Sequence, residues 1–180
     1  MPKLLILCAL EEELPPQHNP YSDFTTYTGI GKVNATIHAL NGIYSLRPDT
    51  IINFGTAGAI SDNLHGLITV TGFIERDMDA TGHDLGFELG QTPFEEEIII
   101  GKSGIICGTG DSFVTSTPSV KCDLVDMEGY ALAKVCKYMN IPFQSYKYIS
   151  DKADNTASED WQRTVKDGQS LFLEKLNEIL

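Results

Sequence analysis

Basic residues are scarce in this chain of 180 residues. Its 13 lysines and arginines stand against 25 aspartates and glutamates, which gives a formal net charge of -12 at pH 7. Three of the basic residues are arginines, namely Arg47, Arg76 and Arg163. Proteins that bind phosphate backbones or anionic membranes draw binding energy from clustered lysine and arginine. The sequence contains no basic run, so we expect neither nucleic acid nor a membrane as a partner.

Long apolar stretches and paired cysteines are also missing. The apolar run at residues 4–10 is far shorter than the roughly 20 residues that cross a bilayer. The cysteines are Cys8, Cys107, Cys122 and Cys136, without a Cys-x-x-Cys pair, and no secretory signal pattern precedes them. We therefore expect reduced thiols and a cytoplasmic protein.

The composition is that of a folded globular protein. Hydrophobic residues make up 42% of the chain and charged residues 21%, and no repeat or low-complexity linker divides it. This length accommodates one domain with a sizeable core. We expect a single domain over residues 1–180.

Strand and helix patterns alternate along the chain. Residues 4–9 and 50–54 are short apolar runs, typical of strands buried on both faces. Residues 32–46 lie between them and predict an amphipathic helix whose apolar face packs on the core. The apolar positions of that face are Val33, Ile37, Leu40 and Tyr44. Strand, helix and strand together predict a βαβ unit with parallel strands.

The rest of the chain extends this pattern. Further strands are predicted at residues 67–74, 97–100, 104–107, 122–126 and 143–149. Helices are predicted at residues 128–139 and across the last twenty residues, where Trp161, Val165, Phe172, Leu176 and Ile179 share one face. The predicted fold class is α/β, a three-layer α/β/α sandwich around a central mixed, largely parallel sheet.

Ligands of such sheets bind beyond the carboxyl ends of the strands. The loops at those ends are residues 11–13, 55–58, 110–113, 126–128 and 150–154, and four of the five carry carboxylates directly after an apolar strand. Any one of these carboxylates can face a ligand, or can belong to a solvated helix start where it favours the helix dipole.

Six motifs in order resemble one family. They are residues 9–13 (ALEEE), 29–35 (GIGKVNA), 51–58 (IINFGTAG), 110–113 (GDSF), 125–129 (VDMEG) and 149–154 (ISDKAD). This series resembles the purine nucleoside phosphorylase superfamily, and within it the methylthioadenosine/S-adenosylhomocysteine nucleosidase branch. The resemblance implies hydrolysis of the N-glycosidic bond of a purine ribonucleoside such as 5'-methylthioadenosine or S-adenosylhomocysteine, without a cofactor or metal.

Breaking that bond passes through an oxocarbenium-like transition state, so one group must activate the nucleophile and another must neutralise the departing base. By resemblance, Glu13 is similar to the general base that deprotonates a water, and Asp151 to the acid that protonates purine N7. Ser150 corresponds to the neighbour that helps to hold this acid. An aspartate at position 151 favours adenine as the base of the substrate, although a 6-oxopurine remains an alternative.

Other positions match substrate contacts of the family. Glu128 is similar to the residue that accepts hydrogen bonds from the ribose hydroxyls, with Met127 packed below the sugar. Phe113 resembles the aromatic stacked on the base, although it could also be a core residue, and the Val114 backbone would contact the purine edge.

The small-residue turn after the second apolar strand matches the family as well. Thr56 would keep a hydroxyl contact to the water, and Ala57 and Gly58 would line the site. Trp161 lies where the family places an aromatic on a flap over the site, or it packs as the first apolar residue of the last helix; both interpretations stay open.

Two positions depart from the family pattern. Lys147 stands where relatives carry an arginine near the ribose and the water, which keeps the charge but loses the planar fork. Asp126 replaces a glutamate and shortens the reach to the 2'-hydroxyl.

The nucleophile distinguishes a hydrolase from a phosphorylase. Phosphorylases of the family place arginines after the first strand and near the small-residue turn, where this chain has Glu11 to Glu13 and Asn53. A glutamate cluster repels phosphate and suits a neutral water. We predict a hydrolase; the alternatives are a phosphorylase and an inactive nucleoside-binding protein.

The chain is shorter than is usual for the branch, after Glu13 and again between Pro93 and Gly104, where a helix is missing. Those regions help to wall the 5' end of the substrate, so the 5'-substituent stays open. In relatives, subunits form dimers and the segment like residues 80–85 reaches the neighbour's pocket. We expect a homodimer.

Metal motifs are weak in this sequence. Residues 77–88 imitate an EF-hand loop at its first, third, sixth and twelfth positions, but Asp84 stands where that loop needs an apolar residue. The four histidines lie too far apart for a zinc pattern. We expect no metal site.

Overall fold

Strands and helices make up most of the chain in the computed structural model, which describes residues 3–83, 86–91, 98–99 and 104–180. The strands are β1 (Leu4–Cys8), β2 (Thr25–Tyr27), β3 (Thr50–Ala59), β4 (Leu67–Glu75), β5 (Ile98–Ile99), β6 (Ile105–Thr109), β7 (Leu124–Asp126) and β8 (Phe143–Asp151). The helices are α1 (Lys32–Leu46), α2 (Gly129–Met139), α3 (Ala157–Thr164) and α4 (Gly168–Ile179). Of the strand predicted at 97–100, Glu97 and Ile100 lie outside the described residues.

The strands form one mixed sheet in the order β2-β1-β3-β7-β6-β4-β5, and β8 pairs with both β3 and β4. Five pairings are parallel, and β3–β7, β4–β5 and β4–β8 are antiparallel. Because β8 joins β3 to β4 on one side and β7 with β6 joins them on the other, these five strands close into a ring. The predicted α/β fold with a mixed, largely parallel sheet is confirmed, and the ring brings the ends of β3, β7 and β8 together.

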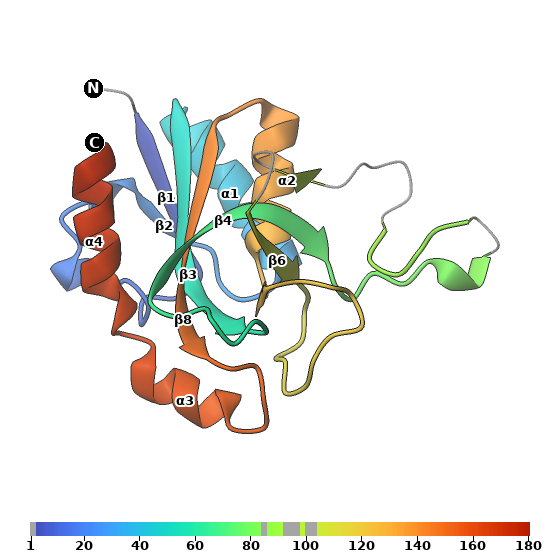
Figure 1. Ribbon diagram of the computed structural model, residues 1–180. Helices are drawn as coiled ribbons and strands as arrows, with labels where there is room; N and C mark the ends of the chain where they lie inside the picture. The colour runs from blue at the N-terminus through green and yellow to red at the C-terminus, as the bar shows by residue number, and fades with distance from the viewer. Residues whose placement is uncertain (1–2, 84–85, 92–97, 100–103) are drawn as a thin grey trace.

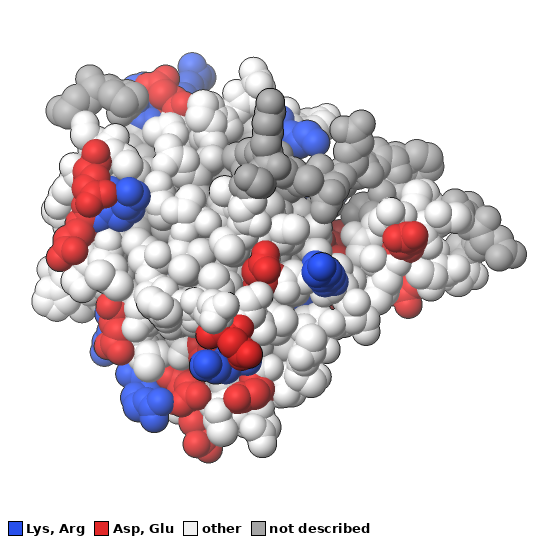
Figure 2. All heavy atoms as spheres, viewed as in Figure 1, with Lys and Arg blue, Asp and Glu red and all other residues white. Residues whose placement is uncertain are grey.

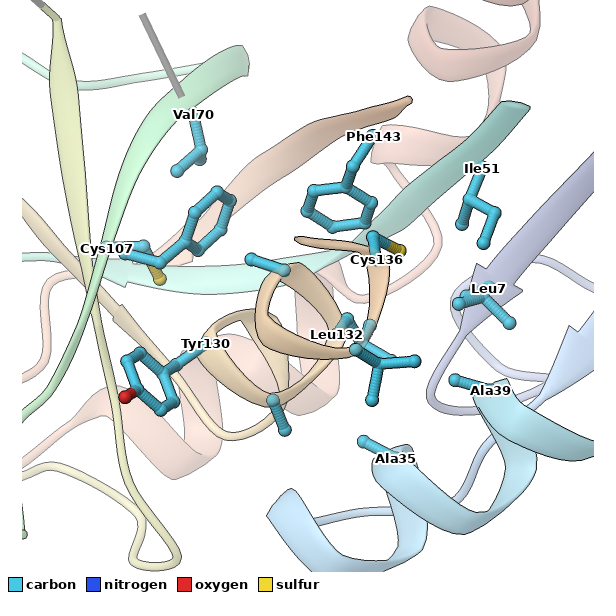
Figure 3. Packing of buried hydrophobic residues seen from close by; sticks show 14 of the residues in the cluster. Leu7, Ala35, Ala39, Ile51, Val70, Cys107, Tyr130, Leu132, Cys136 and Phe143 are labelled. Atoms are coloured by element: carbon cyan, nitrogen blue, oxygen red, sulfur yellow. The ribbon is translucent and has the colours of Figure 1, made fainter. Parts of the chain in front are cut away.

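Helices cover the sheet on two sides, as Figure 1 shows, with α1 and α2 on one side and α4 on the other. In the first core, Leu132 and Cys136 of α2 pack near Ala35 and Ala39 of α1 (Figure 3). In the second core, Phe172 of α4 stacks on Phe54 of β3 with ring centroids 4.3 Å apart. The sheet therefore has an apolar core on each face.

Helix α1 forms where the pattern predicts it, but of the four predicted apolar positions Leu40 alone packs against the core. Val33, Ile37 and Tyr44 are 68%, 50% and 68% exposed. The side that packs on the sheet consists of small residues, including Ala35, Ala39 and Gly42, together with Ile43. A Cβ at Gly42 would lie 3.1 Å from Leu5 Cδ2, so close approach of backbones, rather than large apolar side chains, decides which face is buried.

The last twenty residues form two helices rather than the single predicted helix. A turn at residues 165–167 separates α3 from α4. Trp161 on α3 lines the pocket described below, whereas Phe172 and Leu176 on α4 are fully buried against the sheet. At the start of α4, a Cβ at Gly168 would lie 2.5 Å from Tyr148 Cβ. The chain must turn because these aromatic residues pack in two different places.

The surface of the protein carries charges of both signs. On the face shown in Figure 2, lysine and arginine side chains lie scattered, most of them beside acidic ones. Among the residues described, no helix has both the length and the apolar character needed to cross a membrane.

Candidate active site

A cavity of about 240 Å³ opens at the carboxyl ends of β3, β7 and β8. It is lined by Ala9, Leu10, Glu13, Ile30, Thr56, Ala57, Gly58, Arg76, Ser112, Phe113, Val114, Val125, Asp126, Met127, Glu128, Ser150, Asp151, Ser158, Trp161 and Gln162. Every site residue predicted from the sequence is in this lining except Lys147. Segments far apart in the chain meet here because β3 and β8 run parallel and end at the same edge of the sheet, and β7 pairs antiparallel with the last residues of β3.

Glu13 lies in the turn after β1 and is buried. Its Oε1 accepts hydrogen bonds from the backbone N–H and the hydroxyl of Thr56, each at 2.7 Å. Its Oε2 accepts from the Leu10 N–H at 3.1 Å and from the Cys8 thiol at 3.5 Å. Burial, together with the nearby Glu13 charge, raises the pKa of Cys8. Four donors from β1, its turn and β3 thus fix one carboxylate at the wall of the cavity.

Asp151 ends β8 and is also buried. Its Oδ2 accepts from the Ser150 hydroxyl at 2.7 Å, and its Oδ1 accepts from the Ala153 N–H at 2.8 Å. Burial raises the pKa of Asp151, although these two hydrogen bonds lower it in part. A carboxyl group with a raised pKa holds a proton more readily at neutral pH than an exposed aspartate does.

Glu128 precedes α2, and its Oε1 accepts from the Gly31 N–H at 2.8 Å. Burial and the neighbouring Asp126 charge raise the pKa of Glu128 to about 8. The first turn of α1 therefore supports a carboxyl group that lines the cavity near Met127 and Phe113.

Asp126 and Lys147 form a buried ion pair, with Lys147 Nζ 2.7 Å from Asp126 Oδ2 and both side chains 1% exposed. Asp126 also accepts from the Thr109 hydroxyl at 2.6 Å and from the Gly129 N–H at 2.8 Å. The pKa of Asp126 is lowered: burial acts to raise it, and Lys147 outweighs burial. Both oxygens of Asp126 are thus engaged inside the protein, although the residue lines the cavity.

Lys147 lies beneath the cavity rather than in its wall. Burial acts to lower the pKa of Lys147, but Asp126 and Glu128 raise it above its ordinary value. The position of a Cβ on Gly55 would be 3.3 Å from Lys147 Nζ and 3.4 Å from Glu13 Oε1. The cation therefore lies among three carboxyl groups that border the cavity, and it offsets their mutual repulsion.

Arg76 was missed by the sequence analysis. It follows β4 directly, and its guanidinium donates to the Gly110 carbonyl at 3.0 Å, to the Ser112 hydroxyl at 3.1 Å and to the Ser112 carbonyl. These bonds hold the loop that carries Phe113 at the cavity. A charged residue directly after an apolar strand is the same signal that singled out the other loops. The other lining residues that were not predicted are Ala9, Leu10, Ile30, Ser112 and Val125, which lie within the quoted motifs, and Ser158 and Gln162, which do not.

The amino-terminal end of α1 is closed by carboxylates. The Gly31 N–H donates to Glu128, and the Lys32 N–H donates to Asp111 Oδ1 at 2.8 Å. Free N–H groups at a helix start form an anion site, but here these two are occupied. Among the residues described, no group of three or more histidine, cysteine, aspartate or glutamate side chains is arranged to hold a metal ion. The EF-hand-like segment includes Asp84 and Leu85, which lie outside the described residues.

Comparison with known proteins places the chain in a family. The family model described as Phosphorylase superfamily matches residues 24–180. The 5'-methylthioadenosine/S-adenosylhomocysteine nucleosidase of Staphylococcus carnosus (strain TM300) is 31% identical over 187 aligned positions, which cover 86% of this chain and 81% of that protein. The protein of the same name from Staphylococcus aureus (strain Newman) is 32% identical over 161 positions, covering 73% and 69%.

Solved structures agree on the fold. Futalosine hydrolase of Helicobacter pylori superposes with a TM-score of 0.85 at 23% identity, covering 99% of this chain and 98% of that one. A Helicobacter pylori nucleosidase mutant solved with 5'-methylthioadenosine in its active site gives 0.85 at 21% identity, with 100% of both chains covered. The chain belongs to the phosphorylase superfamily.

Proposed function

We propose that this protein is a purine nucleosidase, which hydrolyses the N-glycosidic bond of a purine ribonucleoside and releases the free base. The observation that carries the proposal is that two buried carboxyl groups, Glu13 and Asp151, face one cavity from different strands in different hydrogen-bond environments. The curated relatives are named 5'-methylthioadenosine/S-adenosylhomocysteine nucleosidases, which makes these two thioribosides the first candidate substrates.

In this mechanism Glu13 is the general base and Asp151 the general acid. Glu13 removes a proton from a water molecule that attacks the anomeric carbon, and Asp151 delivers a proton to N7 of the departing base. The raised pKa of Asp151 supports the acid role, because donation requires the protonated form. Ser150 orients this acid through its 2.7 Å hydrogen bond. Two proton transfers complete the reaction, so we propose no cofactor.

The other lining residues would hold the nucleoside. We place the ribose against Glu128 and Met127, and the base between Phe113 and the turn of Ala57 and Gly58, with the Val114 backbone at the purine edge. Phe113 is half-exposed at the cavity mouth, which leaves a ring face available for stacking. Asp126 and Lys147 would act from behind, by fixing the position and charge balance of Glu128 and Glu13.

Water, rather than phosphate, is the proposed nucleophile. The helix-start N–H groups of Gly31 and Lys32 are already taken by carboxylates. Asn53 replaces an arginine of the family's phosphorylases and is turned inward, where it donates to the Leu7 carbonyl and accepts from Ser145. The cations of this region are also engaged, because Lys147 pairs with Asp126 and Arg76 donates to the loop at Gly110 and Ser112.

The test is incubation of the purified protein with 5'-methylthioadenosine, S-adenosylhomocysteine, adenosine and inosine, with and without phosphate. We expect free base and a free sugar, which is ribose or its 5'-substituted form, at a rate that phosphate does not change. Glu13→Gln and Asp151→Asn should each lower turnover by about 10²–10⁴-fold, whereas the exposed neighbours Glu12→Gln and Asp154→Asn should not. Formation of a ribose 1-phosphate would assign a phosphorylase, and tight binding without any release would assign a nucleoside-binding protein.

We also propose that the protein acts as a homodimer of single-domain subunits of residues 1–180. The supporting observation is an exposed apolar stripe along α1, formed by Ile30, Val33, Ile37 and Tyr44. A patch of this kind on a soluble protein marks an interaction surface. Ile30 also lines the cavity, so a second copy seated on the stripe would extend the cavity wall. Of the segment at 80–85, Asp84 and Leu85 lie outside the described residues.

A cytoplasmic location is part of the same proposal. All four cysteines are free and buried, in keeping with a reducing compartment.

A further inference from the structure

Trp161 is joined to Glu13 by a chain of two hydrogen bonds. The indole N–H of Trp161 donates to Thr56 Oγ1 at 2.9 Å, and the Thr56 hydroxyl lies 2.7 Å from Glu13 Oε1. The Thr56 backbone N–H reaches the same oxygen at 2.7 Å. The chain thus runs from α3, across the end of β3, to the turn after β1.

The direction of this chain follows from the chemistry of its members. An indole N–H is a donor only, whereas a threonine hydroxyl has one proton and two lone pairs. Trp161 must therefore donate to Thr56, and the single hydroxyl proton of Thr56 remains for Glu13. A carboxylate that accepts this proton is held in one orientation, since Thr56 contacts the same oxygen twice.

Helix α3 is attached to both sides of the cavity. Trp161 reaches Thr56, and the Thr164 hydroxyl lies 2.9 Å from the Ser150 carbonyl, next to Asp151, and 2.9 Å from the Asp160 carbonyl of its own helix. The helix that carries Trp161 therefore also contacts the end of β8, where the proposed acid Asp151 lies.

We propose that Trp161 is a positioning residue for the general base. Its indole N–H fixes the Thr56 hydroxyl, which in turn orients the Glu13 carboxylate toward the attacking water. This role requires the N–H and not just the aromatic surface, so phenylalanine at this position would still wall the cavity and would leave Thr56 free to rotate. The inference rests on the proposed hydrolysis, because the water is the group that Glu13 must meet.

The kinetic test compares Trp161→Phe, Thr56→Val, Thr56→Ser and the Trp161→Phe/Thr56→Val double variant. Loss of one hydrogen bond should lower kcat by about five- to tenfold in Trp161→Phe and in Thr56→Val, with KM changed less than about twofold. The double variant should be no slower than the slower single variant, because both changes break one chain. Thr56→Ser retains the hydroxyl and should stay near the wild-type kcat. Unchanged kcat in Trp161→Phe, or effects that multiply, would overturn the proposal.

A spectroscopic test needs no substrate, because Trp161 is the single tryptophan of the chain. Thr56→Val should shift the emission maximum of the ligand-free protein, whereas Thr56→Ser should not. Gln162→Ala is the matched control, since Gln162 lines the cavity from the same helix, and it should leave the emission unchanged. Identical spectra for wild type and Thr56→Val would overturn the contact. If the wild type releases no base, the proposed function fails; if it does and Trp161→Phe retains full kcat, this inference alone fails.

Discussion

Lys147 Nζ lies 2.7 Å from Asp126 Oδ2 in a part of the protein where each of these side chains is 1% exposed. Asp126 in turn receives the first N–H of α2 and the hydroxyl of Thr109 on β6. One buried pair thus joins β8, β7, β6 and the start of α2 directly beneath the cavity.

Breaking this pair from one side should cost stability. Lys147→Met leaves the Asp126 carboxylate buried without its cation, and we expect the free energy of unfolding to fall by about 3–5 kcal/mol. Urea denaturation followed by circular dichroism measures the change. The exposed pair of Lys175 and Glu178 on α4 is the control, and Lys175→Met should produce no measurable change. Equal losses in the two variants would contradict the structural role of the buried pair.

Gly58 is expected to be required for the position of the proposed acid. A Cβ at Gly58 would lie 2.6 Å from Asp151 Oδ1, so Gly58→Ala must displace that carboxyl group. A displacement of about 1 Å should lower kcat by roughly 10²-fold while the circular dichroism spectrum stays native. Lys137 is exposed on α2, so Lys137→Ala should retain full activity. Normal turnover in Gly58→Ala would remove Asp151 from the acid role or show that it relaxes without loss.

The stability of the protein should depend on pH through Glu128. Burial and the Asp126 charge raise the pKa of Glu128 from 4.5 to about 8, above its value in the unfolded chain. The protonated form is favoured by folding, so the contribution of Glu128 is complete below about pH 4.5 and is lost as the pH rises through about 8. Glu128→Gln should flatten the decline in unfolding free energy between those limits. Urea denaturation across this range checks it, and parallel wild-type and variant curves would show that Glu128 does not titrate there.

The α1 stripe should control the oligomeric state. Tyr44→Glu combined with Ile37→Glu places two charges on the proposed dimer surface, and light scattering after size exclusion should show a shift from dimer to monomer. Tyr138 is 90% exposed on α2, outside the stripe, so Tyr138→Glu is the matched control and should remain dimeric. A monomeric wild type at micromolar concentration would refute the homodimer.

The pocket residues could be predicted to a large extent because their signal is local. Most of them lie at or just after the end of an apolar strand, and the pairings of β3, β7 and β8 bring these strand ends to one cavity. The loops that hold Glu13, Glu128 and Asp151 were found in this way, and the resemblance to the family assigned their roles and added Trp161. Arg76 has the same local signal and was missed because no family motif included it.

Other features could not be predicted because they depend on distances between remote segments. The apolar residues of α1 suggested one face, but the helix packs through Ala35 and Ala39, since only small side chains allow its approach to β1. Lys147 matched a family position near the ribose. In the structure its ammonium group instead forms an ion pair with Asp126 beneath the cavity.

The sequence by itself determined the alternation of buried strands and helices, the acidic surface and the set of carboxylates at the strand ends. Only the tertiary structure decided that five strands close into a ring, that the last twenty residues divide into α3 and α4, and that Trp161 contacts Thr56. The physical reason is that periodicity and spacing describe which residues can be buried, whereas hydrogen-bond partners and packing faces are chosen by contacts between segments that are far apart in the chain.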